Sequence, residues 1–278
     1  MGRFDGKVVL ITGGARGQGR SHAVRFATEG ADVAFCDVAA PLASVPYGLA
    51  TPDDVAETVR QVEALGRRCL GVVADVRDQA ATAAFVEQAR AELGRVDFLL
   101  ANAGVLSYAP VAEMDGRKWD EMIATNLTGV FHAMRAVLPL MIEQGHGRVV
   151  ATSSVAGKQG IPNLGHYCAA KWGVIGLVKT AAMEVGEHGI TVNAVCPTTV
   201  ATDMAHNPAT YRLFRPDLPE PTLADAEAAF AEPHVLPVPW IEPADVSATV
   251  AFLCSDEARF ITGETISVAA GMTAGNAG

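Results

Sequence analysis

The sequence contains no block of five like charges and no apolar segment long enough to cross a bilayer. Its 21 basic and 31 acidic residues give a net charge of −10, which argues against a nucleic-acid or anionic-membrane surface. The longest uncharged stretch, 98–112, is interrupted by Asn102, Gly104 and Pro110. It is too short for a membrane span. We therefore expect a chain that binds neither nucleic acid nor membrane.

Metal-binding and disulfide patterns are also missing. The seven histidines show no H-x-x-x-H spacing, which argues against a metal hydrolase and predicts no metal site. The five cysteines are an odd number without a C-x-x-C pair, and they are typical of reduced thiols in a cytoplasmic protein. No repeat and no low-complexity tract interrupts the chain.

Apolar segments of strand length alternate with helical segments along the chain. Half of the 278 residues are apolar, which suffices for one large domain or two small ones. Seven strands are expected, at 7–12, 31–36, 69–74, 96–101, 149–154, 190–196 and 264–270. The pattern predicts an α/β fold: a single doubly wound, Rossmann-like domain over 1–278, with a seven-stranded parallel sheet flanked by helices. Ligands of such sheets bind at the carboxyl ends of the strands.

A glycine-rich turn follows the first expected strand and precedes a helix at about 18–29. Glycines allow a tight turn and a close approach to a pyrophosphate, whose charge the helix N-terminus attracts. The spacing is G-x-x-x-G-x-G rather than the commoner G-x-G-x-x-G, so a merely tight turn is the alternative. The predicted cofactor residues here are Gly13, Ala15, Arg16, Gly17, Gln18 and Gly19.

An acidic residue ends the second expected strand. Asp37 can accept hydrogen bonds from both ribose hydroxyls of an adenosine, and its charge would repel a 2′-phosphate. Arg16 is the counter-indication, because a basic side chain in the glycine turn could reach that phosphate. Like-charge repulsion is hard to offset, so the balance favours NAD over NADP.

Small and polar residues follow the next two strands. A carboxylate at Asp75, beside Val76, could bond the adenine amino group, and Asn102-Ala103-Gly104 lets the chain pass close under a cofactor. A long helix is expected from about 117 to 144. It contains one polar residue among apolar ones, Asn126, which is either a satisfied core amide or a kink that holds water.

Two long connections lie at the expected carboxyl edge of the sheet. Segment 38–52 is uncharged and contains three prolines, so we expect an insertion that covers the adenosine, with a solvent-facing loop as the alternative. Segment 203–240 loses periodicity and is rich in proline and apolar residues. It is expected to be an irregular substrate lid.

A phenol and an ammonium are predicted to lie side by side after the fifth strand. Tyr167 and Lys171 share one helix face at i, i+4 spacing, and Ser154 ends the preceding strand. A free phenol titrates near pH ~10, and a cation within about 4 to 6 Å favours the phenolate. Alone, Tyr-x-x-x-Lys could equally be an ordinary surface pair.

Five separated features together resemble the short-chain dehydrogenase/reductase family: T-G-x-x-x-G-x-G at 12–19, N-A-G at 102–104, Asn126, Ser154 and Y-x-x-x-K at 167–171. The resemblance implies that Tyr167 is the general acid/base and that Lys171 lowers its pKa and binds the nicotinamide ribose. It also implies that Ser154 holds the substrate oxygen and that Asn126 anchors a proton-relay water. Family members contact the nicotinamide carboxamide at positions corresponding to Thr199, Val200 and Thr202, and Pro197 is a further predicted cofactor residue. Thr198 departs from the family, which usually has glycine there.

Segment 38–52, the following T-P-D-D-V-A-E-T and the P-T-T-V of 197–200 resemble a narrower group, the mycofactocin-associated, carveol-dehydrogenase-like subfamily. In that group the insertion covers NAD and hinders its exchange. The resemblance implies a homotetramer and an external redox carrier of the mycofactocin type.

The resulting hypothesis is an enzyme that transfers hydride between a hydrophobic secondary alcohol, or its ketone, and NAD. The alternatives are an NADPH-dependent ketone reductase and a catalytically idle nucleotide-binding scaffold. Candidate substrate-wall residues are Leu106, Tyr108, Gln159 and Met204.

Overall fold

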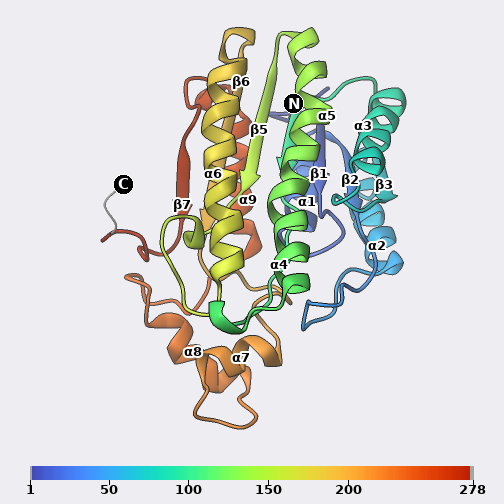
Figure 1. Ribbon diagram of the computed structural model, residues 1–278. Coiled ribbons are helices and arrows are strands. Elements are labelled where there is room, and N and C mark those ends of the chain that lie inside the picture. Colours follow the sequence, from blue (N-terminus) through green and yellow to red (C-terminus); the bar gives the residue numbers. More distant parts are fainter. Residues whose placement is uncertain (1, 276–278) are drawn as a thin grey trace.

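The structure, a computed structural model, describes residues 2–275 and places seven strands in one parallel sheet (Figure 1). The strands are β1 (Val8–Thr12), β2 (Asp32–Asp37), β3 (Cys69–Val73), β4 (Phe98–Ala101), β5 (Gly147–Thr152), β6 (Ile190–Pro197) and β7 (Thr265–Val268). Their order across the sheet is β3-β2-β1-β4-β5-β6-β7. The register pairs Val9 with both Val33 and Phe98. The predicted doubly wound sheet is confirmed.

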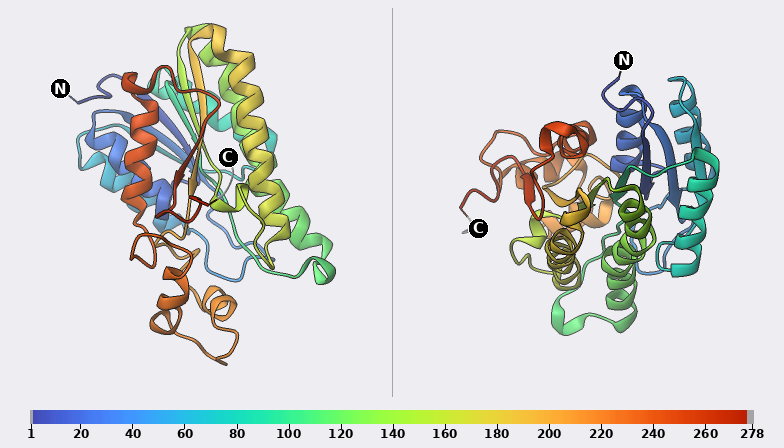
Figure 2. Two further views of the ribbon diagram at one scale, coloured as in Figure 1. Left: turned by 90° about the vertical axis from the view of Figure 1, so that its left-hand side faces the viewer. Right: turned by 90° about the horizontal axis from the view of Figure 1, so that it is seen from above.

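Helices cover both faces of this sheet (Figure 2). One face carries α1 (Gly17–Thr28), α2 (Pro52–Glu63) and α9 (Pro243–Cys254), and the other carries α3 (Gln79–Leu93), α5 (Gly129–Gln144) and α6 (Gly165–Val185). Because both faces are covered, the inner strands are apolar on both sides, as in β1, where every residue is buried. No helix among the described residues is long and apolar enough to cross a bilayer.

Local sequence signals set where these helices begin. Thr51 caps α2 through a reciprocal capping box with Asp54, and Pro52 occupies the first helical position. Asp78 caps α3 by accepting from the amides of Ala80 and Ala81. The 38–52 segment therefore ends at the capped N-terminus of α2.

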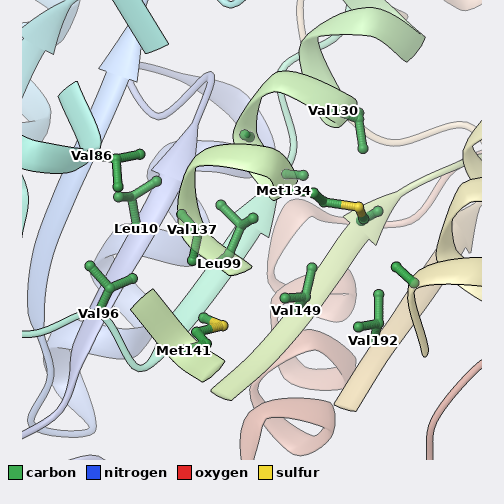
Figure 3. Close-up of a cluster of buried hydrophobic side chains, with 14 of the residues drawn as sticks. Leu10, Val86, Val96, Leu99, Val130, Met134, Val137, Met141, Val149 and Val192 are labelled. Carbon is green, nitrogen blue, oxygen red and sulfur yellow. The ribbon is translucent and has the colours of Figure 1, made fainter. Parts of the chain in front are cut away.

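The core is divided into two clusters by the sheet. Figure 3 shows part of the cluster under α3 and α5, where Leu10, Leu99 and Val149 of three strands meet Val137 and Met141 of α5. The opposite cluster contains a stack of Phe4 and Phe26, with ring centroids 4.8 Å apart. These clusters hold the strand ends, and hence the candidate site, in register.

The predicted helix 117–144 is confirmed as a continuous helical run of α4 (Gly116–Ile123), a π-helical turn at Ala124–Thr128 that contains Asn126, and α5. One expectation about the following segments was wrong. The 203–240 segment is not irregular throughout, because it forms α7 (Pro208–Phe214) and α8 (Leu223–Ala231).

The cap of α8 was readable in the sequence. Thr222 and Asp225 form a capping box at its start. Helices α7 and α8 lie beyond the carboxyl ends of the strands, at the lower end of Figure 1.

Candidate active site

The glycine turn and the N-A-G loop meet between β1 and β4, the neighbouring strands at which the strand order reverses direction. Gly13 has a φ of +69°, and a Cβ there would lie 2.7 Å from the Cα of Ala103. A Cβ on Gly19 would lie 1.9 Å from the carbonyl oxygen of Gly13. Both positions require glycine, because neither backbone neighbour can yield. The turn is thus closed tightly against the start of α1.

Beside this turn lies a groove of about 890 Å³, including its part open to solvent. Most of the predicted cofactor residues line it: Gly13, Arg16, Gly17, Gln18, Gly19, Asp37, Asp75, Val76, Asn102, Ala103, Gly104 and Thr202. The predicted residues Ala15, Pro197, Thr199, Val200, Tyr167 and Lys171 are not among the lining residues. The structure adds lining residues that the sequence did not single out, among them Tyr47, Val105, Thr125 and Asp203.

Three charged side chains that line the groove are those of Asp37, Arg16 and Asp75. Asp37 Oδ2 accepts a hydrogen bond from the Ala15 amide at 3.1 Å. Burial raises the pKa of Asp37, and the Ala15 amide and the Arg16 charge oppose that rise. Arg16 itself donates to Asp203 Oδ2 at 2.9 Å, so its guanidinium is already paired. Asp75 is paired with Arg77, at 2.6 Å.

Asn102 fastens the N-A-G loop to β1. Its Nδ2 donates to the carbonyl oxygens of Thr12 and Gly13, at 3.2 and 3.1 Å. The Thr12 hydroxyl in turn accepts from the amides of Asn102 and Ala103, both at 3.1 Å. These four hydrogen bonds hold the N-A-G loop against the end of β1 and the start of the glycine turn.

Asn126 is fully buried in the π-helical turn, and its side-chain amide bonds with Val105 and with Met122 Sδ, the latter at 2.9 Å. Its Oδ1 accepts from the Val105 amide and its Nδ2 donates to the Val105 carbonyl, both at 2.8 Å. The sequence allowed two interpretations of Asn126, a satisfied core amide or a kink that holds water. The structure shows a satisfied amide, and the helix is widened at this point. Its side chain fixes the wall of the groove.

The three remaining candidate catalytic residues lie at the ends of β5 and α6. Lys171 is almost fully buried, and its Nζ donates to the Thr152 carbonyl at 2.7 Å and lies 5.5 Å from the centre of the Tyr167 ring. Ser154 hydrogen-bonds with Tyr167, and its hydroxyl accepts from the Ala156 amide. A Cβ on Gly104 would lie 3.6 Å from Lys171 Nζ, so this group adjoins the groove.

Burial shifts the pKa values of both Tyr167 and Lys171. Burial raises the pKa of Tyr167 to about 12, and only the Ser154 hydrogen bond lowers it. Burial also lowers the pKa of Lys171 to about 8. In the protein without dinucleotide the pKa of the phenol is therefore raised, because desolvation dominates. The lowering of this pKa by Lys171 together with a bound cofactor stays a prediction.

The four candidate substrate residues do not form one group. Leu106 and Tyr108 pack with Tyr167 and Ile161 against a small apolar cluster of Ala156, Leu164 and Cys168. Met204 lines the groove. Gln159 follows the short 3-10 turn Val155–Gly157 and is neither in that cluster nor among the lining residues.

Thr198, the departure from the family pattern, contacts the 203–240 segment. Its buried hydroxyl hydrogen-bonds with His234 Nε2 at 2.7 Å, and His234 Nδ1 hydrogen-bonds with the Val238 carbonyl at 2.7 Å. A glycine here could not make this contact. In the described part of the chain, no group of three or more His, Cys, Asp or Glu side chains could hold a metal ion.

A parallel sheet with a glycine turn at its switch point and a Ser, Tyr and Lys set beside it defines a dinucleotide-dependent oxidoreductase. Residues 7–211 match the model of the short chain dehydrogenase family. The chain belongs to this family, which confirms the predicted resemblance.

Several relatives extend over almost the whole chain. A (-)-trans-carveol dehydrogenase of Rhodococcus erythropolis is 45% identical, covering 98% of this chain and 99% of the relative. A levodione reductase of Leifsonia aquatica is 37% identical, covering 98% and 96%. The crystal structure of a carveol dehydrogenase from Mycobacterium avium in complex with NAD superposes with a TM-score of 0.97, at 46% identity, covering 99% of this chain and 100% of that one.

Proposed function

We propose that this enzyme oxidises a hydrophobic secondary alcohol to a ketone with NAD, reversibly. The observation that carries the proposal is the convergence of Ser154, Tyr167 and Lys171 beside a groove lined by the glycine turn and Asp37. The NAD complex of a carveol dehydrogenase 46% identical to this chain supports the choice of cofactor.

Each residue of the catalytic set has one task. Tyr167 takes the proton of the alcohol during oxidation and returns it during reduction. Ser154 hydrogen-bonds with the Tyr167 phenol and stabilises charge on the substrate oxygen. Lys171, held by the Thr152 carbonyl, fixes the position of the phenol and lies close enough to Gly104 to meet a ribose there. The bound nicotinamide supplies the hydride acceptor.

Asn126 acts on proton transfer only through its backbone. Both polar atoms of its side chain are engaged by Val105, so a relay water would have to bind the main chain of the π-helical turn. The side chain keeps that turn and the Val105 wall in place.

The remaining cofactor contacts follow the groove. Asp37 receives the adenosine ribose, Asp75 and Val76 face the adenine, and Asn102, Ala103 and Gly104 pass under the dinucleotide. Pro197, Thr199, Val200 and Thr202 follow β6 and receive the carboxamide. NAD is preferred over NADP because Asp37 would repel a 2′-phosphate and Arg16 is paired with Asp203.

The substrate is hydrophobic because the wall beside Tyr167 is apolar. Leu106, Ile161 and Leu164 surround the phenol, and the hydroxyl of Tyr108 is engaged by Thr210 at 2.7 Å. These neighbours would present hydrocarbon and ring faces to a substrate beside the phenol. The names of the carveol dehydrogenase and levodione reductase relatives fit an alcohol and its ketone.

We further propose a cytoplasmic homotetramer that passes electrons to an external carrier of the mycofactocin type. Large apolar side chains on the outer faces of three helices support assembly: Trp172 and Met183 of α6, Phe131 of α5 and Phe252 of α9 are exposed. The five cysteines are free, which fits a reducing compartment. Native mass spectrometry measures both the assembly and retained NAD, and turnover with artificial acceptors but not with free NAD would support the carrier.

The decisive test of the reaction is Tyr167→Phe. The change removes only the hydroxyl, so the fold and NADH binding should persist while turnover on a panel of secondary alcohols falls by about 10² or more. Circular dichroism and NADH titration control for folding and cofactor binding. Near-normal turnover would exclude Tyr167 as the acid/base.

A further inference from the structure

Arg16 lies where three segments that are distant in the sequence meet. Its Nη1 donates to Asp203 Oδ2 at 2.9 Å, and its guanidinium carbon lies 6.0 Å from the centre of the Tyr47 ring. Arg16 belongs to the glycine turn, Tyr47 to the 38–52 segment and Asp203 to the 203–240 segment. One side chain thus joins the cofactor turn to both long connections.

The two connections are joined a second time through the loop after β4. The Leu106 amide donates to the Tyr47 hydroxyl at 3.0 Å, and the Tyr108 hydroxyl hydrogen-bonds with Thr210 Oγ1 at 2.7 Å. Leu106 and Tyr108 are two positions apart in this loop. The 106–108 loop therefore links the 38–52 segment to the 203–240 segment through these two hydrogen bonds. A displacement of the first segment is transmitted to the second through this loop.

Asn207 links Asp203 to Thr210, so that the contacts described above form a closed ring. Its buried Nδ2 donates to the carbonyls of Asp203 and Met204, both at 2.9 Å, and its Oδ1 accepts from the Thr210 amide at 3.0 Å. Asp203 and Thr210 therefore move as one unit. The ring runs from Arg16 through Tyr47, the 106–108 loop and α7 back to Asp203, and three of its members line the groove.

We propose that Arg16 is a positioning residue that couples the two segments, so that dinucleotide release and opening of the substrate side occur together. The inference rests on the proposed function. To leave the groove, the 203–240 segment must break the Arg16–Asp203 ion pair and the 38–52 segment must lose the contact of Tyr47 with Arg16. Because the guanidinium is engaged in this ring, it is withheld from a 2′-phosphate, which adds to the selectivity for NAD.

The test removes one charge from the ring without removing the side chain. Asp203 is 71% exposed at its side chain, so its ion pair is screened and modest in energy. Asp203→Asn should raise the rate of NADH dissociation about two- to fivefold. This rate is measured without substrate, by the fluorescence lost when excess NAD displaces NADH. In the wild type the rate should rise with salt, whereas in the variant it should depend less on salt.

A matched control lies in the same segment. Asp217 is also an exposed acid, but its carboxylate pairs with Arg215, at 2.8 and 2.7 Å, and not with the glycine turn. Asp217→Asn should dissociate NADH at the wild-type rate. Asp203→Asn should also raise the substrate KM by a larger factor than it lowers the kcat of the NAD-saturated enzyme.

The possible outcomes separate the two proposals. Equal dissociation rates and equal salt dependence in the wild type and both variants would overturn the role of Arg16 and leave the reaction untouched. If the wild-type chain bound no dinucleotide, the proposed function itself would fail, and the coupling with it. Faster dissociation in Asp203→Asn alone supports the coupling.

Discussion

The structural role of Asn126 can be separated from a catalytic role by one substitution. Asn126→Ala leaves the amide and the carbonyl of Val105 without partners in a fully buried site. Each orphaned group costs about 1–3 kcal/mol, so the free energy of unfolding should fall by about 2–6 kcal/mol. The π-helical turn also loses the contact that holds it against the groove wall, so turnover should fall as well.

A second buried asparagine provides the control. Asn193 of β6 is equally buried and makes two backbone bonds, donating to the Ile261 carbonyl at 2.7 Å and accepting from the Glu264 amide at 3.0 Å. Asn193→Ala should lose a similar free energy of unfolding, yet its turnover at low temperature should stay near that of the wild type.

The assay is urea unfolding of the dinucleotide-free protein at one protein concentration, combined with steady-state kinetics well below the transition. An unfolding free energy for Asn126→Ala within about 1 kcal/mol of the wild type would refute the reasoning, because two buried bonds cannot be lost at so small a cost. Equal losses of turnover in both variants would show that the effect on activity is only a loss of stability.

Two further outcomes follow from the same structure. Gly19→Ala places a methyl group against the Gly13 carbonyl and should abolish NADH binding in a titration, whereas Gly48→Ala, with no atom within 4 Å of the added Cβ, should bind normally. Burial lowers the pKa of Lys171 from 10.5 to about 8, so between these pH values the unfolded chain binds more protons and the folded state gains stability as pH rises. Relative to Lys171→Met, the dinucleotide-free wild type should therefore gain about 3 kcal/mol in denaturant unfolding across that window, and a pH-independent difference would contradict the assignment.

Local patterns in the sequence were sufficient to predict the main elements of the candidate site. The β-branched run before Gly13, the N-A-G after β4 and the i, i+4 pair of Tyr167 and Lys171 each depend on neighbours in the chain, so each could be placed from spacing alone. The α8 helix was missed although Thr222 and Asp225 spell a capping box, because proline and the loss of periodicity outweighed that signal.

Other features depend on contacts that spacing does not encode. Arg16 and Asp203 are 187 positions apart, so their ion pair follows only from the assembled fold. The π-helical turn at Asn126 depends on bonds to Val105, which belongs to a different element. Desolvation was the third such effect, because burial raises the pKa of Tyr167 in the protein without dinucleotide.

The raised pKa of Tyr167 constrains how the proposed catalytic residues work. Burial shifts both groups toward their neutral forms, with the pKa of Tyr167 raised to about 12 and that of Lys171 lowered to about 8. Without dinucleotide the phenol is protonated at neutral pH, which suits an acid that protonates a ketone oxygen but not a base that accepts the proton of an alcohol. The oxidised nicotinamide carries a positive charge, and a charge in a water-poor site acts strongly on a neighbouring phenol. In the proposed oxidation, the bound dinucleotide would therefore lower the pKa of Tyr167 before the phenol accepts the proton of the alcohol.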